Sequence, residues 1–159
     1  MNLLFTLLAF FVALGILVAV HEWGHYRMAV ACGVKVLTFS IGFGPPLLRY
    51  KPKRQEHGQQ TEFVLAALPL GGFVRMVDKR DSSQTISAAD MAHEFTSQTP
   101  IKRFLIVAAG PVANLVLAVL LYTGLSWWGL PQPAAVLGAP AAQSAAAQAG
   151  IQGGERVAQ

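Results

Sequence analysis

The chain has 159 residues, of which 53% are hydrophobic and only 13% are charged, and its formal net charge is +4. Average proteins carry about a quarter of charged residues, so this composition excludes a disordered tail and a nucleic-acid-binding module and argues against an ordinary soluble domain. The single cysteine, Cys32, excludes an internal disulfide framework.

Two long apolar stretches are predicted to cross a membrane as helices. Residues 3–20 form a run of 18 without a charge, and residues 104–128 form a run of 25. A cleaved signal peptide is the alternative for residues 1–31. It fits poorly, because no basic residue precedes the run and the run is too long. The second helix is predicted to begin at Thr99 and Pro100, an N-cap residue followed by a residue suited to the first turn.

The basic residues are concentrated between the two apolar stretches. Eleven of the twelve Lys and Arg residues lie from Arg27 to Arg103, together with six acids, so this segment has a net charge of +5. The positive-inside rule therefore predicts a cytoplasmic joining segment and two extracytoplasmic termini.

Within the joining segment, a β-hairpin is predicted. Its strands are residues 47–51 and 61–68, connected by the polar, turn-rich residues 52–60. The apolar segments 41–46 and 68–73 are rich in glycine and proline, and we expect them to be irregular backbone that dips into the membrane against protein.

Asn114 lies within the second apolar stretch, close to Gly110 and Pro111. Two interpretations stay open for it. Its amide could form an interhelical hydrogen bond, or it could face a site that contains water.

The motif H-E-x-x-H occupies His21, Glu22 and His25 at the end of the first apolar run. Residues four apart share one face of a helix, so both imidazoles can bind one metal ion, and Glu22 can take a proton from a bound water. Zinc is the expected metal. The alternative is a structural pair of interfacial histidines. However, ionisable residues at a membrane helix are costly and usually functional.

A catalytic zinc site needs a third protein ligand. Cys32, His57 and His93 are weak candidates. Cys32 would sit about 10 Å further along the helix axis than His25, while the other two lie in polar segments. The sequence therefore predicts an incomplete metal site.

Four motifs in order along the chain resemble the bacterial site-2 proteases, in particular the RseP-type regulator-of-sigma-E proteases. They are H-E-W-G-H at 21–25, F-S-I-G-F-G-P at 39–45, P-L-G-G-F-V at 69–74 and A-G-P-V-A-N at 109–114. Residues 149–157 resemble the opening of the PDZ domain of that family.

The resemblance implies an α-helical integral membrane protein: two transmembrane helices, an intervening membrane-associated β-hairpin, and the start of an extracytoplasmic PDZ domain. The implied boundaries are 1–30 for the first helix with its motif, 31–98 for the loop and hairpin, 99–128 for the second helix, and 129–159 for a linker and truncated PDZ domain.

The activity implied by the resemblance is that of an intramembrane zinc metalloprotease of the bacterial inner membrane. His21 and His25 match the zinc ligands of the family, and Glu22 its catalytic glutamate. The third ligand of the family is an Asp in an L-D-G motif, which is expected beyond Gln159, so the 159 residues alone are expected to bind zinc weakly and to be inactive. Implied substrates are membrane-spanning proteins such as anti-sigma factors or signal-peptide remnants, with no nucleic acid among the partners.

Two other function classes fit parts of the sequence. A non-catalytic membrane scaffold related to these proteases would not need Glu22. A metal transporter would need more polar residues in the second helix than Asn114, and it leaves Glu22 unexplained.

The charge distribution makes a testable prediction of topology. Reporter fusions placed within residues 52–60 and at Gln143 should give opposite signals, because the first position is expected in the cytoplasm and the second outside. An alkaline phosphatase and a cytoplasmic reporter at each position provide the measurement. The same signal from both positions would mean that one apolar stretch does not span the membrane.

Overall fold

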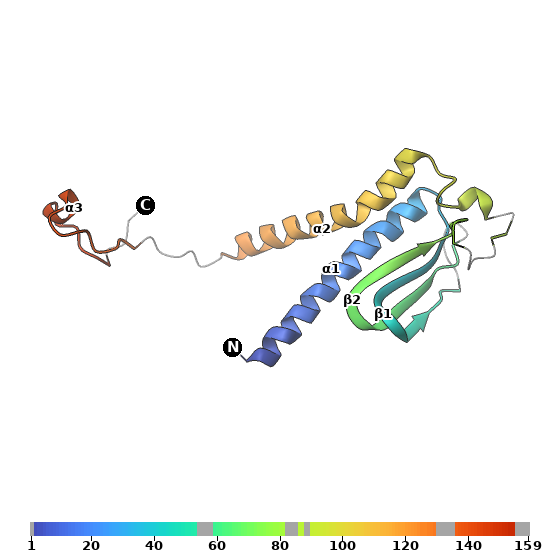
Figure 1. Ribbon diagram of the computed structural model, residues 1–159, viewed down its shortest axis with the longest axis horizontal. Coiled ribbons are helices and arrows are strands. Elements are labelled where there is room, and N and C mark those ends of the chain that lie inside the picture. Colours follow the sequence, from blue (N-terminus) through green and yellow to red (C-terminus); the bar gives the residue numbers. More distant parts are fainter. Residues whose placement is uncertain (1, 54–58, 82–85, 88–89, 130–135, 155–159) are drawn as a thin grey trace. The chain divides into compact units, whose positions relative to one another are not determined.

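The computed structural model describes residues 2–53, 59–81, 86–87, 90–129 and 136–154. The elements in chain order are α1 (Leu3–Ala31), β1 (Val36–Tyr50), β2 (Glu62–Met76), the 3-10 helix η2 (Met91–His93), α2 (Pro100–Trp128) and α3 (Ala145–Gln148) (Figure 1). The chain divides into two compact units, Met1–Leu121 and Tyr122–Gln159. The first unit contains all the predicted site residues.

Helix α1 is apolar around its whole circumference in its first half, as expected for a helix surrounded by lipid. The helix continues past His25 to Ala31, so the predicted metal motif lies inside it rather than at its end. Gly33 ends the helix with a φ of 80°. The amide of Gly33 donates to the Val30 carbonyl and the amide of Val34 to the Ala29 carbonyl, which is a Schellman motif.

Helix α2 begins at Pro100, as the sequence predicts, and the amide of Arg103 bonds to the Thr99 carbonyl at 3.1 Å. Pro111 lies inside the helix and cannot donate a helical hydrogen bond. Figure 1 shows the axis of α2 changing direction where its yellow part passes into orange. Both α1 and α2 are long and apolar enough to cross a membrane, which agrees with the predicted pair of membrane helices.

Strands β1 and β2 form one long antiparallel hairpin. Ile41 pairs with Gly72 near the middle of the hairpin, and Tyr50 pairs with Phe63 near its end. The hairpin also folds back on itself, since residues 38–41 pair both with residues 72–75 and with residues 62–65. The segment 36–41 is therefore flanked by both halves of β2, and residues 72–76 form one edge of the sheet.

The strands are longer than the sequence analysis predicts. Segments 41–46 and 68–73, expected to be irregular, lie inside β1 and β2. The reason is the backbone freedom of glycine: Gly42, Gly44 and Gly71 have φ values of 92°, 85° and 151° and bend the ribbon without ending its pairing. The pairing register shifts repeatedly between Ile41 and Leu48, where the ribbon turns.

Hydrogen bonds from two side chains join the segment just before β2 to the start of β1. The buried Gln59 amide accepts a hydrogen bond from the Val36 amide at 2.8 Å and donates to the Val34 carbonyl at 3.0 Å. The Thr61 hydroxyl donates to the Val36 carbonyl at 2.9 Å. The residues 59–61 are thus aligned beside the start of β1 by side-chain bonds.

A small core joins α1, the sheet and α2. Ala29, Val34, Val36 and Ile106 are all fully or almost fully buried in it. This core fixes the first turns of α2 against the last turns of α1, and therefore sets the distance between the helices at the predicted metal motif.

The second unit contains the short helix α3. Ser144 caps the short helix α3 by accepting a hydrogen bond from the Ala147 amide, and the Gly154 amide donates to the Leu137 carbonyl. A PDZ fold is not shown by the described residues, and residues 155–157 of the predicted PDZ motif lie outside them. The predicted domain boundaries remain predictions.

A buried carboxylate ties the segment before α2 to the end of β2. Glu94 is 0% exposed and accepts hydrogen bonds from the hydroxyls of Thr96 and Ser97 and from the backbone amide of Lys79. Burial alone would raise the pKa of Glu94, but these hydrogen bonds outweigh it and hold the pKa at about 2. Beside it, the Phe95 amide donates to the Val77 carbonyl at 2.9 Å.

We expect Glu94→Gln to destabilise this segment in a pH-dependent way. The folded-state pKa lies below the ordinary value of 4.5, so the carboxylate stabilises the fold above about pH 5 and the effect is lost as pH falls toward 2. At pH 7 the cost should be about 1.5–3 kcal/mol, the value of a hydrogen bond to a charged group. Hydrogen exchange of residues 77–97, compared between wild type and variant from pH 3 to pH 7, measures it. A difference that does not shrink at low pH would contradict this role.

Candidate metal centre

The candidate site lies where α1 and α2 cross. A β-carbon added to Gly24 of α1 would lie 2.4 Å from the carbonyl oxygen of Ala109 and 2.9 Å from the β-carbon of Ala113. Real contacts of this kind are never so short, so the two backbones meet here without an intervening side chain. The crossing places the motif of α1 against Gly110 of α2.

His21 and His25 face the same point on α2. Their Nε2 atoms are 3.2 Å apart. A β-carbon on Gly110 would lie 2.3 Å from Nε2 of His25 and 2.8 Å from Nε2 of His21. The backbone of α2 at Gly110 therefore lies directly against both nitrogens, and a side chain at this position would collide with them.

This arrangement fits the two-histidine part of a zinc site. Zinc–nitrogen bonds of about 2.0–2.1 Å in tetrahedral geometry place two ligand nitrogens about 3.3 Å apart. The observed 3.2 Å between the Nε2 atoms matches that spacing. Gly110 allows both imidazoles to approach α2 this closely, because any side chain there would collide with the two Nε2 atoms.

The other nitrogen of each imidazole contacts α2. Nδ1 of His25 lies 2.7 Å from the carbonyl oxygen of the buried Ile106. A carbonyl only accepts, so this nitrogen carries the proton and the Nε2 lone pair is available to a metal. Nδ2 of Asn114 lies 3.4 Å from Nδ1 of His21. The contact supports the first interpretation of Asn114, an interhelical hydrogen bond, and its partner is His21 of the candidate site.

Glu22 is buried between α1 and the sheet, with 9% of its surface exposed. A β-carbon on Gly72 of β2 would lie 2.8 Å from Cγ of Glu22 and 3.1 Å from a methyl group of Val18. The edge of the sheet is therefore in direct contact with the residue predicted to be the catalytic base. Sequence reasoning identified the motif containing Gly72 but not its contact with Glu22, because no local pattern reports a contact between residues fifty apart.

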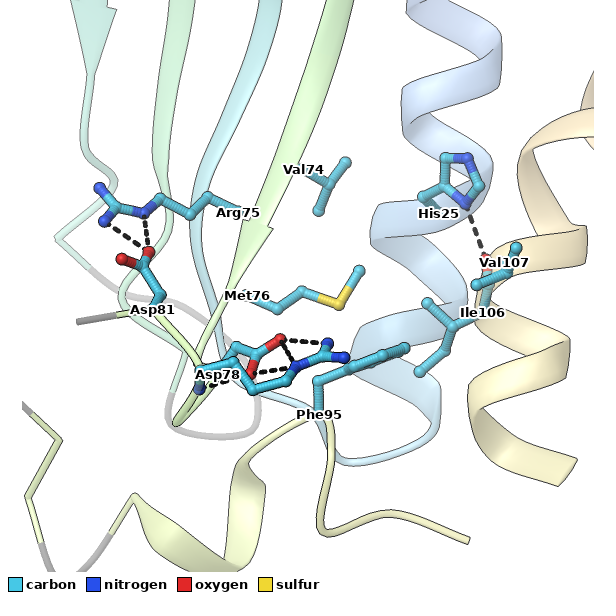
Figure 2. Close-up of a pocket in the computed structure, with 10 residues that line it drawn as sticks. His25, Val74, Arg75, Met76, Asp78, Asp81, Phe95, Ile106 and Val107 are labelled. Atoms are coloured by element: carbon cyan, nitrogen blue, oxygen red, sulfur yellow. Dashed lines mark hydrogen bonds and ion pairs between the residues drawn. The ribbon is translucent and has the colours of Figure 1, made fainter. Parts of the chain in front are cut away.

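A cavity of about 420 Å³ opens beside His25, between the edge of β2 and the first turns of α2. Figure 2 shows Val74 and Met76 of β2 on one side and Ile106 and Val107 of α2 on the other. Its wall also carries two ion pairs, which are Arg80–Asp78 at 2.6 Å and Arg75–Asp81 at 2.8 Å.

Sequence reasoning did not single out the charged residues of this wall. The hydrogen bond from Arg80 is the largest cause that lowers the pKa of Asp78. Both aspartates of the wall are therefore engaged by arginines rather than presented to a metal. Asp78 and Asp81 follow β2 and lie far from His25 in sequence, so no local motif predicts that they line this cavity.

The described residues contain no group of three or more His, Cys, Asp or Glu side chains that could hold a metal ion. Cys32 caps the end of α1, and its carbonyl accepts a hydrogen bond from Lys102. His93 bonds to the carbonyl of Gly33 at 2.9 Å and is exposed. His57 lies outside the described residues. None of the described candidates joins His21 and His25.

Comparison with known proteins agrees with this arrangement. Residues 9–153 match the model of peptidase family M50. A protein of Neisseria meningitidis that is provisionally named a zinc metalloprotease is 48% identical over 153 residues, which are 96% of this chain and 32% of that protein. Protease RseP of Yersinia pestis is 44% identical over 155 residues, which are 97% of this chain and 33% of that protein.

The chain belongs to peptidase family M50. The resemblance to the RseP-type site-2 proteases is confirmed, since the regulator of sigma-E protease RseP of Salmonella typhimurium is also 42% identical over 151 residues. The chain spans about a third of the length of the curated relatives that it matches.

The close contact between Gly110 and the two imidazoles gives a testable prediction. Gly110→Ala should weaken zinc binding about tenfold or more, because its methyl group would collide with both Nε2 atoms and change their spacing. Gly124→Ala on the same helix is the matched control, since a β-carbon there meets nothing within 4 Å. Zinc content and competition with a chelator, measured on the purified proteins in detergent, compare the two. Equal zinc affinity in both variants would show that the metal does not bind at the helix crossing.

Proposed function

We propose that this protein is, or is part of, an intramembrane zinc endopeptidase in which His21 and His25 hold the metal and Glu22 is the catalytic base. One observation carries the proposal. Two imidazole Nε2 atoms lie 3.2 Å apart beside Gly110, where a side chain would collide with them, and the buried Glu22 is adjacent in sequence to one of the two histidines. Membership in peptidase family M50 supports the same reaction class.

Each histidine has a separate means of orientation. The Ile106 carbonyl fixes the ring of His25, and Asn114 contacts the ring of His21. His21 and His25 would hold a zinc ion through their Nε2 atoms, and when bound it would supply Lewis acidity toward water and the substrate carbonyl. A third protein ligand is needed, and we place it outside these residues, as an Asp beyond Gln159.

Glu22 has the position of a proton carrier. Its carboxyl group can take a proton from the attacking water and deliver it to the nitrogen of the departing amine. The apolar surroundings of α1 and the backbone of Gly72 keep bulk water away from it. Proton transfer therefore takes place between Glu22 and the reacting groups rather than with solvent.

The edge of β2 supports a role in holding the substrate. A helical substrate hides its carbonyl groups within its own hydrogen bonds, so it must become extended before cleavage. Residues 72–74 pair with β1 on one side, and within the described residues no strand pairs with their other side. An extended peptide could add to this edge by backbone hydrogen bonds, which would place it beside Glu22 and the cavity at His25.

The substrates that suit this site are membrane-spanning segments. We propose proteins such as anti-sigma factors or signal-peptide remnants, and a location in the bacterial inner membrane with both ends of this chain on the extracytoplasmic side. The two apolar helices and the relatives named for sigma-E regulation support this assignment.

The proposal predicts that Glu22→Gln abolishes cleavage but keeps the metal. An amide cannot accept the proton of water, so the rate should fall by a factor of about 100 or more, while the two histidines remain intact. Cleavage of a model transmembrane substrate and the zinc content are measured together on the full-length protein in detergent.

Glu62→Gln is the matched control for this experiment, because Glu62 lies at the start of β2 and pairs with Arg49 at 3.5 Å. It should retain both cleavage and zinc. Normal cleavage by Glu22→Gln would refute the protease mechanism and would favour a scaffold that does not use Glu22.

A further inference from the structure

The hydrogen bonds around the two histidines fix where their protons lie when no metal is bound. Nδ1 of His25 must donate to the Ile106 carbonyl, so Nε2 of His25 is an acceptor. Nε2 of His21, 3.2 Å away, must then be the donor. That leaves Nδ1 of His21 as an acceptor, and it faces Nδ2 of Asn114, which donates.

This series of hydrogen bonds leaves one atom of Asn114 without a partner. Within the described residues, Oδ1 of Asn114 is buried and has no hydrogen-bond partner. A buried carbonyl oxygen without a partner is costly. The amide of Asn114 is thus turned so that its donor is used and its acceptor is not.

Metal binding requires a different proton arrangement. Both Nε2 lone pairs are then engaged, so the proton of His21 must sit on Nδ1. A protonated Nδ1 cannot face the NH₂ group of Asn114, because two donors would oppose each other. Rotation of the amide by about 180° exchanges its two ends and presents Oδ1 to this nitrogen, which also satisfies the unpartnered oxygen.

We propose that Asn114 is a positioning residue whose amide turns over between the metal-free and metal-bound site and so selects the tautomer of His21. This inference rests on the proposed function in one respect, namely that His21 and His25 are metal ligands. The Ile106 carbonyl cannot turn in this way, because it belongs to the backbone of α2, and Ile106 is held in the small core that joins α1, the sheet and α2. His25 is therefore held in one tautomer, and the adjustable ligand is His21.

The test is the nitrogen NMR spectrum of the full-length protein with ¹⁵N-labelled histidine in detergent, recorded without metal and with zinc. Replacement of each histidine by glutamine assigns the signals. In the wild type, His21 should carry its proton on Nε2 without metal and on Nδ1 with zinc. Finding His21 protonated on Nδ1 in both states would overturn the proposal.

Two variants separate the role of the amide from packing. Asn114→Asp presents only acceptor atoms, so its His21 should be protonated on Nδ1 even without metal. Asn114→Leu keeps the volume but offers no partner, so its zinc affinity should fall by about 10- to 100-fold. An Asn114→Leu protein that binds zinc as tightly as wild type would contradict the proposal.

Leu115→Ala is the control for local disturbance of α2, because Leu115 is the next residue and is exposed. It should leave both the His21 tautomer and the zinc affinity unchanged. The outcome is independent of the proposed catalysis, since it can be read in the Glu22→Gln protein. A wild-type protein that shows the expected His21 tautomers but no cleavage would count against the proposed catalysis alone. A wild-type protein that cleaves its substrate without the expected tautomers would count against the role of Asn114 alone.

Discussion

Helices α1 and α2 can share one site because each has a glycine where the other packs against it. Gly24 lies against the Ala109 carbonyl, and Gly110 lies against the two imidazoles of the motif. A side chain at either position would clash with the facing helix, and relief of that clash would move the Ile106 carbonyl away from His25. Small residues serve close helix contact in membranes generally, because apolar attraction between helices is weak in lipid. Here the same closeness brings the Nε2 atoms of both histidines against the backbone of α2.

The sheet depends on the same helix through a different set of contacts. Trp23 and Tyr26, from the exposed turn of the motif, pack against Phe39 of β1, and Tyr26 and Phe39 both contact Phe63 of β2. These aromatic pairs, with ring centres 5.5–6.3 Å apart, lie in the range of favourable edge and tilted contacts. They hold the hairpin beside α1 so that Gly72 reaches Glu22. One short stretch of α1 therefore presents the metal-binding face to α2 and an aromatic face to the sheet.

The sequence predicted the two long helices, the start of α2 at Pro100 and the presence of a hairpin, because these follow from apolar runs, an N-cap pattern and turn residues. It underestimates the strands, because glycine and proline usually predict the end of strand pairing, whereas Gly42 and Gly71 bend a ribbon that continues to pair. It named His21, Glu22 and His25 as candidates, since their spacing is local. The Ile106 carbonyl and the edge of β2 at Gly72 could not be predicted. A backbone carbonyl has no sequence signature, and both contacts arise only when distant segments pack.

The side chain of Gln59 forms hydrogen bonds that a backbone peptide group usually forms in a sheet. Its amide bonds to the amide of Val36 and to the carbonyl of Val34, as a neighbouring peptide group would in a sheet. Hairpin register is usually set by the geometry of the connecting turn. Here Gln59, a residue of the connection between β1 and β2, aligns residues 59–61 beside the start of β1. The end of the connection is thereby bound to the start of β1, so the position at which β2 begins at Glu62 is fixed by a side chain as well as by the turn.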